Sequence, residues 1–165
     1  MSRSFDEVYA HDRRRVLASV FALCGSAAAA EEITQEAFLR AYTHWGRISS
    51  HDRPDLWVRR VAINLATSAF RRRAAERRAL ERARGGAATV VGELSGSTTE
   101  VWVAVRALPR RQAQAVVLVY VDDRTAEEAG HVMGIAPATV RVLLHRARAR
   151  LAVDLQELDI EEAPT

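Results

Sequence analysis

Apolar residues recur every three or four positions along most of the chain, which is the spacing of amphipathic helices. In residues 5–24 one broad face is apolar and comprises Val8, Val16, Val20 and Leu23. Residues 27–45 keep the same period, whereas residues 46–53 are polar and break it. Pro54 then opens a long helix, because proline is favoured at the first helical position. The pattern predicts three helices in the first 84 residues.

The second half predicts four shorter helices. The second of them contains a valine-rich run with strand propensity, but its helical period and the lack of a strand partner favour a helix. Thr125 and Glu128 have the spacing of a capping box at the start of the third helix, and Gly134 supplies a tight turn after it. The helices are expected over residues 101–107, 110–121, 126–133 and 137–151.

A segment without a usable period separates the two halves. Residues 85–99 contain four glycines, five serines or threonines and a single charge, which is typical of a flexible tether. We therefore predict an all-α fold of two small helical domains, residues 1–84 and 100–153, joined by this linker. Residues 154–165 form an acidic tail.

Charge is unevenly distributed along the 165 residues, whose formal net charge is +3. All 24 basic residues are arginine, and seven of them lie in residues 71–84 with only two glutamates. A second strip comprises Arg141, Arg146, Arg148 and Arg150. Two concentrated basic strips indicate a polyanionic partner. The alternative is a pair of ordinary solvated helix faces.

Composition also limits location and chemistry. The N-terminus lacks the apolar core of a signal peptide, and the longest apolar run, residues 115–121, is too short to cross a bilayer. We expect a cytoplasmic protein without membrane insertion. One cysteine excludes a disulfide framework, and the five histidines show no ligand spacing. We expect no cofactor, no metal and no enzymatic activity.

Residues 125–150 have the pattern of a helix-turn-helix. Gly130 is small where the second helix crosses the first, and Gly134 tolerates a left-handed backbone. In the second helix a buried stripe comprises Val140, Leu144, Ala147 and Leu151. The opposite side presents small residues followed by arginines, which suits a major groove and its phosphates. An ordinary helical hairpin is the alternative.

Three parts of the chain resemble regions of extracytoplasmic-function sigma factors of bacterial RNA polymerase. Residues 30–42 (AEEITQEAFLRAY) look like their region 2.2. Residues 56–66 (LWVRRVAINLA), followed by three arginines, look like regions 2.3 and 2.4. Residues 108–112 (LPRRQ) and 144–151 (LHRARARL) resemble region 4. The matches cover nearly the whole chain in the family's order, with a linker where the family has one.

The resemblance implies a subunit that directs the polymerase core to promoters. Region 2.2 in that family docks on the clamp helices of the beta-prime subunit, and region 4 contacts the beta flap. The matching helix here is expected to expose an acid-containing ridge and to turn Ile33, Phe38 and Tyr42 inward. The predicted core-binding residues are Glu32, Gln35, Glu36 and Arg40. A plain solvated helix face is the alternative.

The resemblance further implies that regions 2.3 and 2.4 melt and read the minus-10 promoter element. Polar residues advance along the long helix by four, three and four positions, opposite Trp57, Val61 and Leu65. The predicted minus-10 contacts are Arg60, Asn64, Thr67, Arg71 and Arg72. The polar loop 46–53 matches the place where the family captures an unstacked base. Trp57 either stacks on DNA or belongs to the core.

Region 4 would read the minus-35 element through the last helix. The predicted contacts are Ala138, Thr139, Arg141, Val142, His145, Arg146 and Arg148. Val142 and Leu143 depart from the family, whose members carry a small polar residue and an arginine there. This departure implies either reliance on DNA shape and phosphates or an apolar contact with a regulatory protein.

Family members are commonly sequestered by an anti-sigma protein, and the resemblance implies such a partner here. Two other classes stay open. One is a DNA-binding regulator that uses the helix-turn-helix without the polymerase. The other is a sigma-like interaction protein that cannot melt promoters.

Overall fold

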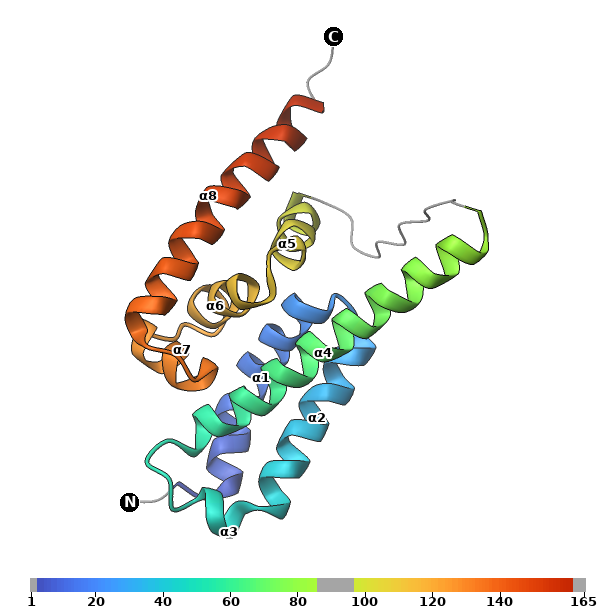
Figure 1. The fold of residues 1–165 in the computed structure, drawn as a ribbon. Coiled ribbons are helices and arrows are strands. Elements are labelled where there is room, and N and C mark those ends of the chain that lie inside the picture. The colour runs from blue at the N-terminus through green and yellow to red at the C-terminus, as the bar shows by residue number, and fades with distance from the viewer. Residues whose placement is uncertain (1–2, 86–96, 162–165) are drawn as a thin grey trace.

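The computed structural model describes residues 3–85 and 97–161, and within these ranges it contains eight helices and no strand (Figure 1). This confirms the all-α prediction. The N-terminal domain, as we call the first four helices, comprises α1 (Phe5–Cys24), α2 (Ala27–Thr43), α3 (Trp45–Ile48) and α4 (Pro54–Ala83). The C-terminal domain comprises α5 (Ser97–Ala107), α6 (Arg110–Tyr120), α7 (Ala126–Met133) and α8 (Pro137–Glu161).

In the N-terminal domain α1, α2 and α4 pack around one apolar core. Val8, Val16 and Val20 of α1 are buried as their spacing predicts. Ser4 caps α1 in a reciprocal capping box, and Gly25 ends it in the left-handed conformation. Each helix therefore begins and ends on local signals, while packing of its apolar face supplies most of the stability.

The segment between α2 and α4 differs from the prediction. The expected helix over residues 27–45 ends at Thr43, and a short helix, α3, lies in the segment expected to be a polar loop. Ile48 explains the difference, because its side chain is 1% exposed and joins the core. Burying this one apolar side chain stabilises the fold by about 1.5–3 kcal/mol, which favours folding the segment back onto the domain.

The C-terminal domain confirms a helix over the valine-rich run, which forms α6 with Val116, Val117 and Leu118 buried. Two boundaries differ. Helix α5 begins at Ser97, inside the expected linker, and α8 continues past residue 151 to Glu161, inside the expected acidic tail. The rest of the predicted linker, residues 86–96, and of the tail, residues 162–165, lies outside the described residues.

The two domains pack against each other. Helices α5 and α6 contact α1, and α7 contacts α4, so the C-terminal domain lies along one side of the N-terminal bundle while the C-terminal half of α4 projects away (Figure 1). No helix within the described ranges is both long and apolar enough to span a membrane.

Candidate nucleic-acid and polymerase interfaces

Helices α7 and α8 form the helix-turn-helix that the sequence predicts. Thr125 Oγ accepts a hydrogen bond from Glu128 N, and Glu128 accepts one from Thr125 N, both at 3.1 Å. Gly134 is left-handed with φ 66°, and its N–H bonds to the carbonyl of Gly130. A side chain at Gly130 would meet the Ile135 carbonyl oxygen at 2.7 Å. The tight turn therefore requires glycine at both positions.

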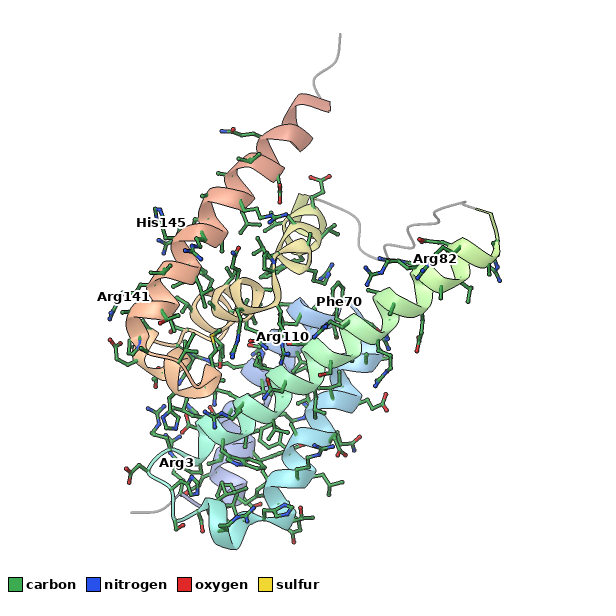
Figure 2. All side chains as sticks on the ribbon, viewed as in Figure 1. Arg3, Phe70, Arg82, Arg110, Arg141 and His145 are labelled. Carbon is green, nitrogen blue, oxygen red and sulfur yellow. The ribbon has the colours of Figure 1, made fainter. Side chains whose placement is uncertain are left out.

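The outer face of α8 carries the predicted minus-35 residues. All seven are exposed: Ala138, Thr139, Arg141, Val142, His145, Arg146 and Arg148. Figure 2 shows Arg141 and His145 pointing away from the rest of the molecule. Arg141 pairs with Glu127 at 2.6 Å, and Arg148 lies over the ring of Tyr120 and bonds to its hydroxyl at 2.7 Å. Val142 is 47% exposed, whereas Leu143 packs against the core. The two residues therefore do not form one apolar contact surface.

Helix α2 presents the predicted polymerase-binding ridge. Glu32, Gln35 and Arg40 are exposed, and Glu36 is half-buried and accepts a hydrogen bond from Arg40 at 2.6 Å. The expectation that Tyr42 faces inward is wrong, because this side chain is 64% exposed.

Helix α2 also exposes an apolar surface that the sequence analysis missed. Tyr42 packs its ring edge-on against Phe5 of α1, with centroids 5.1 Å apart. Leu39 is likewise 55% exposed. Both border a groove of about 350 Å³ between α1 and α2 that also reaches Gln35. The ridge is therefore polar along one edge and apolar along the other. The signal available in the sequence was Leu39, an apolar residue among the polar ridge positions Gln35, Glu36 and Arg40.

The predicted minus-10 residues divide into two groups along α4. Arg71 and Arg72 are exposed on the projecting part of the helix, which Arg82 marks in Figure 2. Arg60 and Asn64 are exposed too, whereas Thr67 is buried, and the polar ends of all three bond to the C-terminal domain. Trp57 is half-buried and packs against the core, which favours its structural interpretation.

Each member of the second group bonds to a different part of the C-terminal domain. Arg60 donates to the carbonyls of His131 at 2.6 Å and Val132 at 3.0 Å, so its cation lies at the C-terminal end of α7, where positive charge is favoured. Asn64 Oδ1 accepts from Arg110 at 3.4 Å. Thr67 was expected on a polar face, but it is 7% exposed and accepts a bond from Gln114 of α6 at 3.1 Å.

A polar hollow of about 650 Å³ lies at the predicted base-capture loop. Ser50, His51, Asp52 and Arg53 of this loop line one side. Arg124, from the connection between α6 and α7, lines another. The hollow carries hydrogen-bonding groups of both kinds, which could pair with the edge of an unstacked base.

A buried ion cluster joins the two domains and was not predicted. Arg59 of α4 is 1% exposed and donates to Asp12 of α1 at 2.8 Å and to both carboxylate oxygens of Asp122, one of them at 3.1 Å. Asp55 lies 3.6 Å from the same guanidinium. Burial would lower the pKa of Arg59, but its bonds and attraction to Asp122 and Asp12 outweigh burial and raise it. The group is therefore a permanent cation in a carboxylate cage.

Comparison with known proteins identifies the family. The sequence matches Sigma-70 region 2 over residues 8–76 and Sigma-70, region 4 over residues 98–151. The RNA polymerase sigma-E factor of Streptomyces antibioticus is 30% identical over 132 residues, which cover 80% of this chain and 73% of that protein. This chain belongs to the sigma-70 family of RNA polymerase sigma factors.

Other relatives agree with this assignment. The ECF RNA polymerase sigma factor SigW of Bacillus subtilis is 26% identical over 160 residues, covering 84% of each chain. The fold matches the sigma factor RpoE in its co-crystal structure with the anti-sigma factor NepR from Bartonella quintana, with a TM-score of 0.71, 20% identity and coverage of 92% and 96%. CnrH in complex with the cytosolic domain of CnrY gives 0.67, 22% identity and coverage of 93% and 88%.

The two family matches assign each surface to a region of the sigma factor. The α2 ridge and α4 lie within the region 2 match, and the helix-turn-helix of α7 and α8 lies within the region 4 match. The chain is thus an RNA polymerase sigma factor of the ECF type, which acts in transcription initiation at promoter DNA.

Proposed function

We propose that this sigma factor brings the polymerase core to promoters through four contacts. The α2 ridge binds the beta-prime clamp helices and the C-terminal domain binds the beta flap, while α4 contacts the minus-10 element and α8 the minus-35 element. The observation that carries the proposal is the outer face of α8, where all seven predicted minus-35 positions are exposed on a capped helix-turn-helix. Such a helix places its N-terminal residues on base edges and its arginines on phosphates.

Strand opening requires that bases leave the duplex stack, which costs a few kcal/mol for each base. Contacts of single-stranded DNA with the protein offset this cost. The exposed Arg71 and Arg72 supply charge for the backbone, Asn64 supplies a donor and an acceptor for a base edge, and the hollow at the loop of residues 46–53 supplies a place for one extruded base.

Run-off transcription with purified polymerase core on a genomic fragment library tests the whole proposal. We expect new transcripts that share two sequence elements upstream of their start sites. The double variant Asn64→Ala and Arg71→Ala should abolish opening, read by permanganate reactivity of unpaired thymines, while core binding is retained. DNA binding without any transcript would indicate a regulator that works without the polymerase, and core binding without opening would indicate a sigma-like interaction protein.

Docking is tested separately by core affinity. Gln35→Ala and Glu36→Arg should each weaken binding to the core, because one removes a polar contact and the other places a cation against a basic surface. Ala10→Arg adds a positive charge at an exposed position of α1 and serves as the matched control. Equal core affinity of all three variants and the unchanged chain would contradict the docking assignment.

We also propose that an anti-sigma protein controls this sigma factor in the cytoplasm. In two solved structures of similar fold, RpoE is bound to the anti-sigma factor NepR and CnrH to the cytosolic domain of CnrY. Affinity purification of the tagged chain from its native host should return one further protein beside the polymerase subunits. Recovery of polymerase subunits alone would contradict this.

A further inference from the structure

We propose that the free chain rests in a closed state in which the C-terminal domain partly covers the minus-10 face of α4 and bonds to its polar atoms, and that the buried ion pair between Arg59 and Asp122 is the latch of this state. The proposal rests on the proposed function, because it takes Arg60, Asn64 and Thr67 as DNA contacts. The contacts among the two domains are independent of that assignment.

The covering is specific to the minus-10 face. Arg60, Asn64 and Thr67 follow one another along α4, and each bonds to the C-terminal domain: to the end of α7, the start of α6 and the middle of α6. Arg60 and Asn64 keep exposed surface, but the atoms that make these bonds must release them before they can bond to DNA instead. The closed state therefore competes with the minus-10 complex for these polar atoms.

The latch is composed so that opening leaves no charge stranded. Arg59 keeps Asp12 and Asp55, which belong to its own domain, when Asp122 departs. Asp122 is 0% exposed in the closed state and lies in the connection between α6 and α7, so separation returns its carboxylate to water. A buried ion pair loses much of its attraction to desolvation, yet removal of one partner is costly. This combination gives a closed state that opens but depends strongly on Asp122.

Weaker ion pairs surround the latch. Arg53 of the N-terminal domain bonds to Glu128 of α7 at 2.6 Å, and Arg15 of α1 lies 3.9 Å from Asp123. The Asp123 side chain is 86% exposed, so solvent screens its pair and leaves it little weight. Asp123 therefore offers a neighbouring carboxylate that differs from Asp122 mainly in burial.

The experiment measures the distance between the domains in the full chain. Nitroxide labels on Ala28→Cys in α2 and Ala149→Cys in α8, both exposed positions, report it by double electron–electron resonance in a Cys24→Ala background. We expect one narrow distance population for the otherwise unchanged chain. Asp122→Asn should raise the ratio of open to closed chains roughly 10- to 100-fold, because it removes the negative charge from the acceptor that Arg59 bonds to.

Matched variants separate the latch from general damage. Asp123→Asn removes the same charge one residue away, at a position with φ 56° that asparagine tolerates, and should change the ratio less than about fivefold. Glu128→Gln keeps the capping box of α7 but weakens the pair with Arg53, so it should open the chain by a smaller factor than Asp122→Asn. Glu128→Gln also tests the proposal if Asp122→Asn fails to fold.

Covering is read by the affinity for a fluorescein-labelled random single-stranded 20-mer without polymerase. If the open state holds about 1% of the free chain, Asp122→Asn should tighten binding by about 10- to 50-fold, because apparent affinity scales with the competent fraction. Adding Asn64→Ala should remove most of this gain. Unchanged distances in both Asp122→Asn and Glu128→Gln overturn the latch, and open distances without a gain in affinity overturn the covering. If Asp122→Asn shows open distances but the unchanged chain supports no run-off transcription, the proposed function is refuted and the latch stands.

Discussion

Replacing Gly130 by alanine tests the geometry on which the minus-35 surface depends. An ideal Cβ at this position lies 2.7 Å from the carbonyl oxygen of Ile135 and 3.4 Å from the nitrogen of Pro137. Both are backbone atoms, so no change of rotamer can relieve the contact. The turn between α7 and α8 must move by several tenths of an ångström.

The magnitude follows from three opposing terms. Alanine gains about 1 kcal/mol over glycine in a helix. Overpacking costs about 1–3 kcal/mol, and displacement of the turn weakens the 3.0 Å hydrogen bond from Ile135 N to the Gly130 carbonyl, which is worth about 1 kcal/mol. We expect a net destabilisation of about 1–3 kcal/mol. Gly46→Ala is the control: no atom lies within 4 Å of its added Cβ, and it should stabilise by about 0.5–1 kcal/mol.

Urea unfolding followed by circular dichroism measures both variants. Gly130→Ala should lower the midpoint and Gly46→Ala should raise it. In buffer without urea, folded Gly130→Ala should also bind promoter DNA more weakly, because a shifted turn reorients α8. A midpoint for Gly130→Ala equal to or above that of the unchanged chain would refute the close crossing of α7 and the turn.

Three further outcomes are expected. Arg146→Ala should reduce the slope of log affinity against log salt for DNA binding by about 0.9, whereas Arg14→Ala, exposed on α1, should leave it unchanged. Burial raises the pKa of Asp55, but bonds and charge from Arg53, with the charge of Arg59, outweigh it and lower the pKa. This carboxylate therefore contributes stability above its unfolded pKa of about 3.9, which is lost as the pH falls through the folded value. A urea midpoint that falls below pH 4 less steeply in Asp55→Asn would verify this. Burial also raises the pKa of the Cys24 thiol, so it should react with Ellman's reagent at pH 8 only as fast as the chain unfolds.

Local signals in the sequence predicted local structure well. The bounds of α1 follow from an apolar period and a terminal glycine, and those of α7 from a capping box and Gly134. These signals act within a few residues and need no knowledge of the rest of the chain. The same holds for the exposed face of α8, because the buried period of Val140, Leu144 and Ala147 fixes the opposite side.

Features that depend on distant partners were not predicted. Tyr42 lies on the expected inward side of α2, but its ring packs at the edge of Phe5 and stays exposed. The polar segment before α4 contains the short helix α3 because the side chain of Ile48 packs in the core. In both cases a contact across the domain decides the outcome over the period of the helix itself.

The ion cluster left a trace in the sequence. Asp12 stands four residues from both Val8 and Val16, inside the apolar stripe of α1, and it is 2% exposed. A carboxylate in such a stripe needs a buried cation, so the sequence indicates that Asp12 has a cationic partner but does not identify it. The partner, Arg59, lies 47 residues away on α4, and no spacing rule connects the two residues.

On the proposal of a closed state, promoter DNA and the C-terminal domain compete for Arg60. Its guanidinium completes the end of α7 by bonding to two carbonyls, so the group that would grip promoter DNA also stabilises the helix-turn-helix in the closed state. A protein that binds the closed state more tightly than the open state lowers the affinity for DNA, and DNA lowers the affinity for that protein by the same factor. Such a partner needs no contact with α4. An anti-sigma protein that holds the two domains together would thus lower the affinity of the minus-10 surface for DNA without contacting that surface.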